Sequence, residues 1–227
     1  MARLARIVAA GVAHFVAQRG NRDQDVFFGD DDYALYKELL AEGCKAAGTA
    51  IWAYCLMPNQ VQLLLVPSDE DGLRAALGDA HRRYTRAVNL REGWRGFLWQ
   101  GRFASFPMDE ANVLEAARYV ERTPVRAKLA RSVRDWKWSS ARAHLAGKID
   151  GVVDVKPLRA LVPDWAAFLR AAPPEDALEA IRKSESTGRP LGSAVFVKKL
   201  EKRLGRTLAK QKPGPKPKGA KGRKKKV

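Results

Sequence analysis

Two glutamines lie one residue apart on an otherwise apolar stretch of the chain. Residues 54–66 read YCLMPNQVQLLLV, and the Met-Pro-Asn corner separates two apolar runs, which predicts an antiparallel hairpin. Alternate side chains of a strand point to the same side, so Gln60 and Gln62 are expected to share one face. Two polar side chains next to each other on an apolar strand need hydrogen-bond partners, and the structural interpretation is a hydrogen-bonded cross-strand pair.

A tyrosine and a threonine on a later helix could complete a site with these glutamines. Tyr119 and Thr123 are four residues apart, so they lie on the same side of the predicted helix. A tyrosine hydroxyl near a divalent cation is a candidate nucleophile for a phosphodiester, because the metal would polarise the phosphate while the phenolate attacks phosphorus. The alternative interpretation is a half-buried core tyrosine.

A second set of residues has the types that contact nucleic acids. Guanidinium groups bind backbone phosphates, and aromatic rings stack on splayed bases. Such residues occur on the turn after the first strand, on an aromatic segment and after Pro124. The predicted DNA-binding residues are Arg19, Asn21, Arg22, Trp99, Gln100, Arg102 and Arg126.

Several of these features also have purely structural interpretations. Trp99 and Phe103 could equally belong to the hydrophobic core. On the predicted helix 71–90, the arginines Arg82, Arg83 and Arg86 could form only a solvated face. Further along the chain, Trp136 and Trp138 are interpreted as packing anchors.

The composition predicts a globular protein with a basic extension. The chain has 227 residues, and its 46% hydrophobic content is enough for a sizeable core. Of the net charge of +17, the segment 198–227 contributes +13, with 14 Lys/Arg against one acid, which leaves +4 for residues 1–197. A tail rich in Lys, Pro and Gly is expected to be disordered and to attract polyanions by counterion release, with a merely solubilising tail as the alternative.

Cysteine usage and hydropathy give an expectation about the compartment. Cys44 and Cys55 lie in apolar contexts and are predicted to be buried free thiols of a reducing compartment. The apolar run at the N-terminus is too short for a membrane-spanning helix and has no small-residue cleavage site. We therefore expect a soluble cytoplasmic protein with no membrane partner.

The hydrophobic pattern predicts the order strand, helix, strand, strand, helix, strand, helix. The predicted strands are 7–19, 50–57, 61–66 and 96–108, and the predicted helices are 30–48, 71–90 and 108–122. The last helix is expected to be capped by Asp109 and to stop at Thr123, before Pro124. This order is typical of an α+β, ferredoxin-like split βαβ antiparallel sheet with helices on one face.

The remaining chain is predicted to be mainly helical. We expect a short helix in 132–146, a small subdomain at 150–175, a linker at 182–193, and a basic amphipathic helix or helical hairpin at 191–208. The predicted organisation is a ferredoxin-like domain at 1–148, a small, mainly helical C-terminal region at 149–208 and a disordered basic tail at 209–227.

Five segments of the chain together carry a family resemblance. They are GVAHFVAQRGNRDQDVFF, YCLMPNQVQLLLV, LWQGRFASFPMDE, ARYVERTPVRAKL and WKWSSARAHLAG. In this order, over roughly residues 1–148, they resemble the single-tyrosine HUH transposases with their IS200-like transposase domain, and most closely the REP-associated tyrosine transposases. The later GRPLGSAVFVKKLEKRLGR is similar to the C-terminal segment of that branch.

The resemblance implies a ferredoxin-like fold that is often dimeric and acts on single-stranded or hairpin DNA. Members of the family cut one strand through a 5′-phosphotyrosine link, with Mg²⁺ or Mn²⁺ as the cofactor. It implies that Tyr119 is the nucleophile and that the metal-ligand positions fall on Gln60, Gln62 and Thr123. DNA and a second copy of the chain are the implied partners.

The ligand positions depart from the family pattern. After Met-Pro-Asn the family strand usually reads His-hydrophobic-His, whereas this chain has Gln60, Val61 and Gln62, and Thr123 replaces the usual Asn or Gln. Imidazole is a good ligand for Mn²⁺, while a carboxamide without a carboxylate beside it binds a hard cation weakly. His14, on the first strand, could in principle face the pocket.

Three functions therefore stay open at this point. The first is a transposase that nicks DNA through Tyr119 with a metal, and the second is a decayed or repurposed relative that binds DNA structure without cutting it. The third is an RNA-binding module, which suits the fold and the basic tail but lacks the aromatic RNA-reading strand motif.

Overall fold

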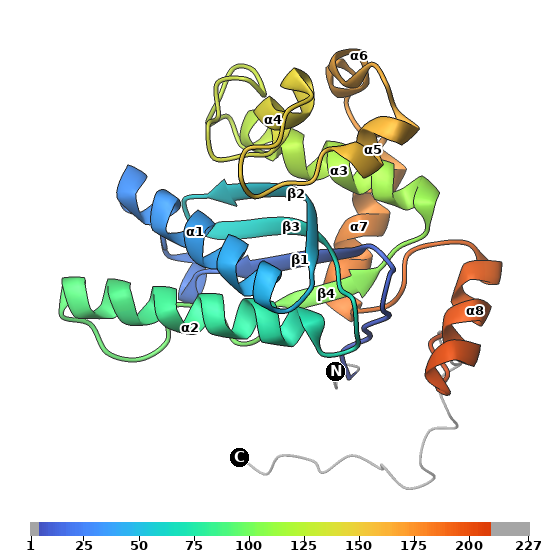
Figure 1. Ribbon diagram of the computed structural model, residues 1–227, viewed down its shortest axis with the longest axis horizontal. Coiled ribbons are helices and arrows are strands. Elements are labelled where there is room, and N and C mark those ends of the chain that lie inside the picture. Colours follow the sequence, from blue (N-terminus) through green and yellow to red (C-terminus); the bar gives the residue numbers. More distant parts are fainter. Residues whose placement is uncertain (1–4, 210–227) are drawn as a thin grey trace, which may run out of the picture.

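A four-stranded antiparallel sheet lies at the centre of the protein (Figure 1). The computed structural model describes residues 5–209, so most of the predicted tail at 209–227 lies outside the described residues. The strands are β1 (His14–Arg19), β2 (Ala50–Met57), β3 (Gln60–Val66) and β4 (Ala104–Pro107). Their order is β2-β3-β1-β4 with antiparallel neighbours throughout, so the predicted α+β, ferredoxin-like fold is confirmed.

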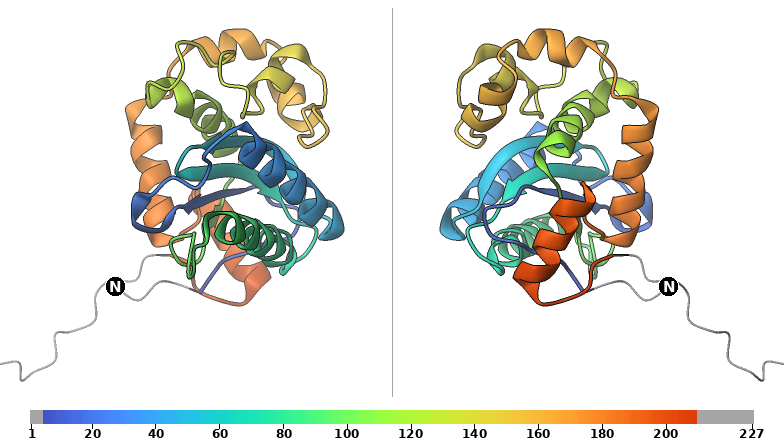
Figure 2. Two further views of the ribbon diagram at one scale, coloured as in Figure 1. Left: turned by 90° about the vertical axis from the view of Figure 1, so that its left-hand side faces the viewer. Right: turned by 90° about the vertical axis from the view of Figure 1, so that its right-hand side faces the viewer.

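Helices cover both faces of this sheet. On one face α1 (Asp30–Ala46) and α2 (Gly72–Glu92) pack side by side against inward-facing strand residues. On the other face α3 (Glu110–Arg126) packs against β2 and β3 (Figure 2). The predicted placement of the helices on one face of the sheet is therefore correct for α1 and α2, whereas α3 lies on the other face. Because α3 follows the edge strand β4, after the split βαβ unit is complete, it covers the face that the unit leaves open.

The C-terminal part of the described chain is helical; its last helix packs against Ile7 and Ala9, and the helices before it pack on the α3 face. Its elements are α4 (Ala141–Ala146), α5 (Lys156–Leu161), α6 (Trp165–Arg170), α7 (Glu175–Thr187) and α8 (Ala194–Leu204). Leu158, Trp165 and Ile181 share one apolar cluster with residues of the sheet and of α3. The helices α5 to α7 thus extend the core of the sheet domain, and a boundary at residue 148 stays a prediction.

Two strands are shorter than predicted. β1 begins at His14 instead of residue 7, because Ile7 and Ala9 pack against Leu200 and Leu208 in a separate cluster. β4 occupies only the end of the predicted 96–108 strand. Gly96 and Gly101 have φ angles of 97° and 61°, which interrupt an extended path before Ala104.

Helix α3 is longer than predicted. It passes through Pro124 and ends at Arg126, so the predicted stop at Thr123 is wrong. The ring of proline fixes φ at a helical value, and near a helix end the missing N–H removes a single backbone bond. The Thr123 hydroxyl also lies 2.7 Å from the carbonyl oxygen of Tyr119, one turn earlier, and this contact supports the last turn.

The predicted linker at 182–193 is also wrong in its first half. The helix α7 continues to Thr187, and its apolar side chains Leu178 and Ile181 are buried. The predicted helix in 132–146 is confirmed only for 141–146. The predicted helix or hairpin at 191–208 is the single helix α8, with Ser193 as its cap.

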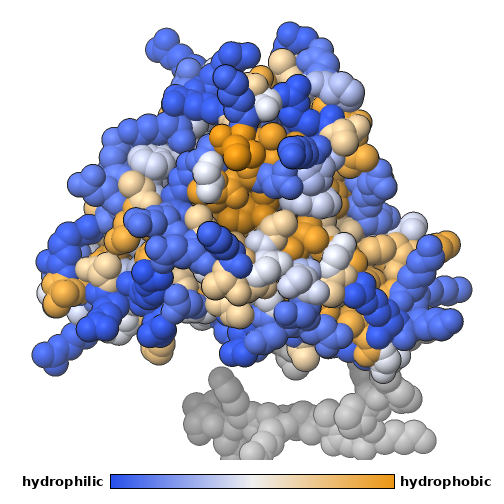
Figure 3. All heavy atoms as spheres, viewed as in Figure 1, coloured by the Kyte–Doolittle hydropathy of each residue, from blue (hydrophilic) through white to orange (hydrophobic). Residues whose placement is uncertain are grey.

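The surface seen from the α1–α2 side is mostly hydrophilic, with an apolar area near β2 below α4 and α5 (Figure 3). No helix within residues 5–209 is long and apolar enough to cross a bilayer. Cys44 and Cys55 are buried free thiols, as predicted.

Candidate functional site

Strand β3 presents both glutamines to the α3 face of the sheet. Gln62 lies opposite Ala17 of β1, and Gln60 lies opposite Arg19 of the same strand. Their neighbours on that face belong to the cluster that packs against α3. The predicted pairing of Gln60 and Gln62 on one face is therefore confirmed.

Helix α3 carries a stripe of three side chains on the face of the sheet that holds these glutamines. Tyr119, Thr123 and Arg126 follow one another at i, i+4 and i+7, so they form a single stripe on the helix. The Thr123 Oγ1 lies 2.8 Å from Oε1 of Gln62, which joins the helix to the strand. Of the two helix residues, Thr123 contacts Gln62, while the Tyr119 side chain packs on Phe15 of the same face.

Arg126 is held against the same stripe by several contacts. Its Nη2 donates to Thr123 Oγ1 at 2.7 Å, and its Nη1 donates to the carbonyl oxygen of Tyr119 at 3.4 Å. The guanidinium carbon is 4.0 Å from the centre of the Tyr119 ring, which is a cation–π contact. The positive charge of Arg126 thus lies directly beside the tyrosine.

The hydroxyl of Thr123 is at the centre of this network. It has one proton, so it donates either to Gln62 Oε1 or to the carbonyl oxygen of Tyr119, both of which lie within 2.8 Å. Turning the Gln62 amide over would instead let its Nε2 donate to the hydroxyl, which would then donate to the Tyr119 carbonyl oxygen. In either orientation the Gln62 amide is bound to Thr123.

Tyr119 combines a buried ring with an open hydroxyl. The side chain packs edge-on against Phe15, with the ring centres 5.9 Å apart, and the residue is 5% exposed. The hydroxyl has no hydrogen-bond partner within residues 5–209, yet it is not among the fully buried polar atoms that lack one. The ring is therefore part of the core, while the oxygen is accessible to solvent.

The residues at the implied metal position do not fit a divalent cation. Gln62 and Thr123 are already hydrogen-bonded to each other, which leaves the buried, unpartnered Oε1 of Gln60 as a neutral oxygen. A hard cation needs carboxylate or several oxygen ligands, and the neighbouring group is the cationic Arg126. Among residues 5–209, no cluster of three or more His, Cys, Asp and Glu side chains could hold a metal ion.

His14 does not face this site. Its Nδ1 donates to the carbonyl oxygen of Val12 at 2.7 Å, and its Nε2 accepts from the backbone N–H of Ala9 at 3.3 Å. It alternates along β1 with Phe15, which points to the α3 face. Burial lowers the pKa of His14 to about 4, so the ring is neutral and structural. The expectation that it could face the pocket is wrong.

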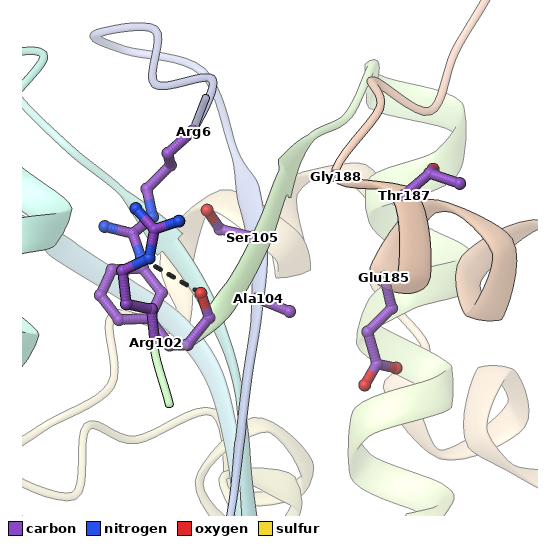
Figure 4. Close-up of a pocket in the computed structure, with 8 residues that line it drawn as sticks. Arg6, Arg102, Ala104, Ser105, Glu185, Thr187 and Gly188 are labelled. Atoms are coloured by element: carbon purple, nitrogen blue, oxygen red, sulfur yellow. Dashed lines mark hydrogen bonds between the residues drawn. The ribbon is translucent and has the colours of Figure 1, made fainter. Parts of the chain in front are cut away.

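A basic groove lies next to the glutamine face, between β1, β4 and α7. It encloses about 280 Å³, and its charged lining residues are Arg19, Arg102, Arg182 and Glu185. The Arg19 guanidinium pairs with the Glu185 carboxylate at 2.9 Å. Burial raises the pKa of Glu185 although Arg19 opposes the shift. Figure 4 shows a smaller adjoining cavity, which is lined by Ala104 and Ser105 of β4 on one side and by Glu185 and Thr187 of α7 on the other.

The groove gathers several of the predicted DNA-binding residues. Arg19, Gln100 and Arg102 line it, and the N–H of Gln100 donates to the carbonyl oxygen of Arg19 at 2.8 Å. The short 3₁₀ turn Asn21–Asp23 follows β1 directly, and it carries the exposed Arg22. Arg126 lies apart from this group, on α3 beside Tyr119.

Trp99 is not placed as a DNA-binding residue would be. It is 7% exposed and its ring packs against Tyr36, His81 and Tyr84, so the core interpretation applies to it. Phe103 is likewise in the core. An indole buried among other rings has no free face on which a base could stack.

The other structural interpretations are confirmed where contacts test them. The guanidinium groups of Arg82 and Arg83 pair with Asp79 and Glu42 on the helix surface. The tryptophans anchor the segment before α4: Trp136 donates to the carbonyl oxygen of Leu56 at 2.9 Å, and Trp138 stacks on Tyr33.

The α7 side of the groove is absent from the sequence-based prediction. The predicted linker contains Arg182 and Glu185, although the acids after Pro174 and the apolar Leu178 and Ile181 are signals of an amphipathic helix.

A buried polar cluster is a second feature that the sequence pattern did not reveal. In it the Glu121 carboxylate accepts from Trp165 Nε1 at 2.8 Å and lies 2.6 Å from His144 Nδ1. These contacts tie α3 to α4 and α6.

Comparison with known proteins places these features in a family. The family model described as "Transposase IS200 like" matches residues 8–123, which is half of the chain. This stretch includes the glutamine strand and the stripe up to Thr123. No curated protein sequence matches the chain.

Two solved structures are similar to this chain. A REP-associated tyrosine transposase bound to a REP hairpin is 18% identical, with a TM-score of 0.57, and the match covers 69% of this chain and 94% of that one. A Deinococcus radiodurans protein described as a transposase is 22% identical, with a TM-score of 0.38, over 53% of this chain and 97% of that one. The first of these shares the fold.

Proposed function

Because the chain belongs to the IS200-like transposase family, we propose that it binds single-stranded or hairpin DNA in the basic groove between β1, β4 and α7. The observation that carries the proposal is the gathering of Arg19, Arg102 and Arg182 along this groove, beside the face that holds Tyr119. Guanidinium groups bind phosphates by paired, charge-assisted hydrogen bonds. A structurally similar transposase is bound to a REP hairpin, and this supports the choice of ligand.

The open hydroxyl of Tyr119 favours a second, catalytic function at the same site. The phenolic oxygen would attack the scissile phosphorus, and the bond from phosphorus to the 3′ oxygen would break. The released strand would leave with a 3′ hydroxyl, while the 5′ phosphate would stay on Tyr119. The rival is a protein that binds the same DNA and cuts nothing.

Binding can be tested with labelled oligonucleotides and fluorescence anisotropy. A hairpin with a single-stranded flank is compared with the fully paired duplex and with an RNA hairpin of the same sequence. We expect the DNA hairpin to bind more tightly than either. Equal or tighter binding of the RNA hairpin would instead favour the RNA-binding alternative.

The groove is tested with the double variant Arg19→Gln, Arg102→Gln. Because the variant would neutralise two fewer phosphates, hairpin binding should weaken. The magnitude of the slope of log affinity against log salt should fall by about 1.4 to 1.8. The control is Arg74→Gln, Arg82→Gln, which removes the same charge from exposed ion pairs on α2. The groove assignment fails if both double variants bind the hairpin with the same reduced affinity.

A further inference from the structure

We propose that the guanidinium of Arg126 takes the place of a divalent cation in this site and binds a DNA phosphate beside Tyr119 without metal. This inference rests on the proposed DNA-binding function. In the family pattern the positive charge of the site would come from a metal held by imidazoles. In this chain it would come from the guanidinium of Arg126. The inference follows from three features of Arg126: the atom that it binds, the donors that it keeps free and the charge that it places there.

The first feature is the position of the guanidinium. Its Nη2 donates at 2.7 Å to Oγ1 of Thr123, and this oxygen in turn contacts Gln62 at 2.8 Å. Thr123 and Gln62 are the residues at two of the three implied ligand positions. The oxygen that would face a cation therefore faces the cationic head of Arg126.

The second feature is the hydrogen-bonding capacity that remains. A guanidinium has five N–H donors, and Arg126 uses one towards Thr123 and one, in a long contact, towards the Tyr119 carbonyl. The residue is exposed, so its other donors are available to a ligand from solution. A planar fork of this kind can bind two phosphate oxygens at once.

The third feature is electrostatic. A cation bound to Thr123 Oγ1 at an ordinary metal–oxygen distance would lie within about 5 Å of the Arg126 nitrogen, since both would contact one oxygen atom. The two positive charges would repel each other at this range. The carboxylate that α7 brings to this face, Glu185, is already paired with Arg19.

The first test uses the unaltered protein. Mn²⁺ binding, without DNA, is measured by electron paramagnetic resonance. We expect the wild-type protein and the Gln60→Ala, Gln62→Ala variant to bind the same amount of Mn²⁺. Hairpin affinity should be the same within about twofold in Mn²⁺ and in EDTA at fixed ionic strength. Tight Mn²⁺ binding that depends on these glutamines, or hairpin binding that disappears in EDTA, would overturn the inference.

The second test asks what excludes the metal. The variant Gln60→His, Gln62→His supplies imidazole ligands but keeps Arg126, and we expect it to bind Mn²⁺ weakly. Adding Arg126→Gln should tighten Mn²⁺ binding by about tenfold or more, because the repulsion is removed. If the double and triple variants bind Mn²⁺ equally, the guanidinium is not what excludes the metal and the inference fails.

The third test concerns the phosphate. Arg126→Gln should weaken hairpin binding by about tenfold in EDTA, and Arg126→Lys should recover part of this affinity, because it keeps the charge without the fork. The control Arg131→Gln removes a charge from an exposed position five residues later and should have little effect. An Arg126→Gln protein that binds the hairpin as tightly as the control contradicts the proposal.

These outcomes separate the inference from the proposed function. If no DNA binds, the proposed function fails, and the Mn²⁺ measurements still decide whether the site excludes metal. If DNA binds but needs a metal, the proposed function stands and the inference falls. Circular dichroism of every variant identifies any that fails to fold, and in that case the measurements on the unaltered protein decide.

Discussion

At the scale of single residues, the site is a hydrogen-bonded network of neutral groups next to one fixed cation. A carboxamide both donates and accepts, so Gln62 can satisfy the Thr123 hydroxyl in either orientation. Thr123 then offers its lone pairs to Arg126, and Arg126 covers the face of the Tyr119 ring. The glutamines thus act through hydrogen bonds in a position where relatives are expected to have metal-binding histidines.

Strand cleavage by Tyr119 would leave the DNA covalently attached to this residue. Incubation with a labelled hairpin oligonucleotide should produce a covalent protein–DNA band on a denaturing gel, and Tyr119→Phe should abolish it. Phenylalanine keeps the ring that packs against Phe15 and Arg126, so hairpin affinity should change by less than about twofold.

The matched control is Tyr33→Phe, which removes a hydroxyl from the opposite face of the sheet. It should leave the covalent band unchanged. A hairpin that binds tightly to the wild-type protein and forms no band under any condition would establish the binding-only alternative.

At the scale of elements, two helices position the site, and only part of each was predictable. Period-two and period-3.6 patterns are local, so the glutamine strand and the Tyr119–Thr123 pairing could be read from the sequence. The last turn of α3 could not, because a proline usually marks a helix boundary. This turn places Arg126 on the same stripe, so the error concealed the network around Thr123.

Helix α7 was missed for a different reason. Its polar stretch after Ile181 resembles a linker, and its burial against β4 and α3 depends on contacts that are distant in sequence. The chain after α7 also pairs with the end of β4, where the N–H of Leu191 donates to the carbonyl oxygen of Pro107 at 2.9 Å. Tertiary packing of this kind overrides local composition. The Arg19–Glu185 ion pair, which closes one side of the groove, depends on it.

The Arg19–Glu185 ion pair makes stability and DNA binding depend on the charge of Glu185. Burial raises the pKa of Glu185, so the folded protein holds this proton more readily than the unfolded chain does. The ionised carboxylate therefore lowers the free energy of unfolding as the pH rises above the ordinary value of 4.5. The variant Glu185→Gln should be at least as stable as the wild type at pH 7, and its stability should depend less on pH above 4.5.

The same variant should also bind the hairpin several-fold more tightly, because Arg19 is released and a negative charge leaves the groove. The measurements are chemical unfolding at several pH values and hairpin anisotropy. Glu179→Gln, at an exposed position of the same helix, is the control and should change neither property. Weaker hairpin binding by Glu185→Gln than by this control would mean that the carboxylate helps to organise the groove.

At the scale of the whole molecule, positive charge is distributed between the groove and the C-terminal segment. The segment 198–227 accounts for +13 of the net +17. Residues 198–209 of this segment are held to the folded chain by hydrogen bonds. The backbone N–H groups of Leu208 and Ala209 donate to Glu201, and Arg189, just after α7, donates to the carbonyl oxygen of Leu208 at 2.6 Å. The basic tail is thus attached near the groove helix α7.

Removing residues 210–227, which carry nine Lys/Arg and no acid, should weaken hairpin binding at low salt and reduce its salt dependence. The slope of log affinity against log salt should fall by about 0.7 for every single-strand phosphate that the shortened chain no longer neutralises. Discrimination between the hairpin and the duplex should persist, because the tail contributes charge without sequence or shape readout, whereas the groove is part of the fold. A neutral Gly/Ser/Pro tail of equal length is the control for chain length, and it should behave like the truncation. A truncated protein with the wild-type slope would show that the tail makes no contact with DNA, and a weaker preference for the hairpin would show that the tail takes part in recognition.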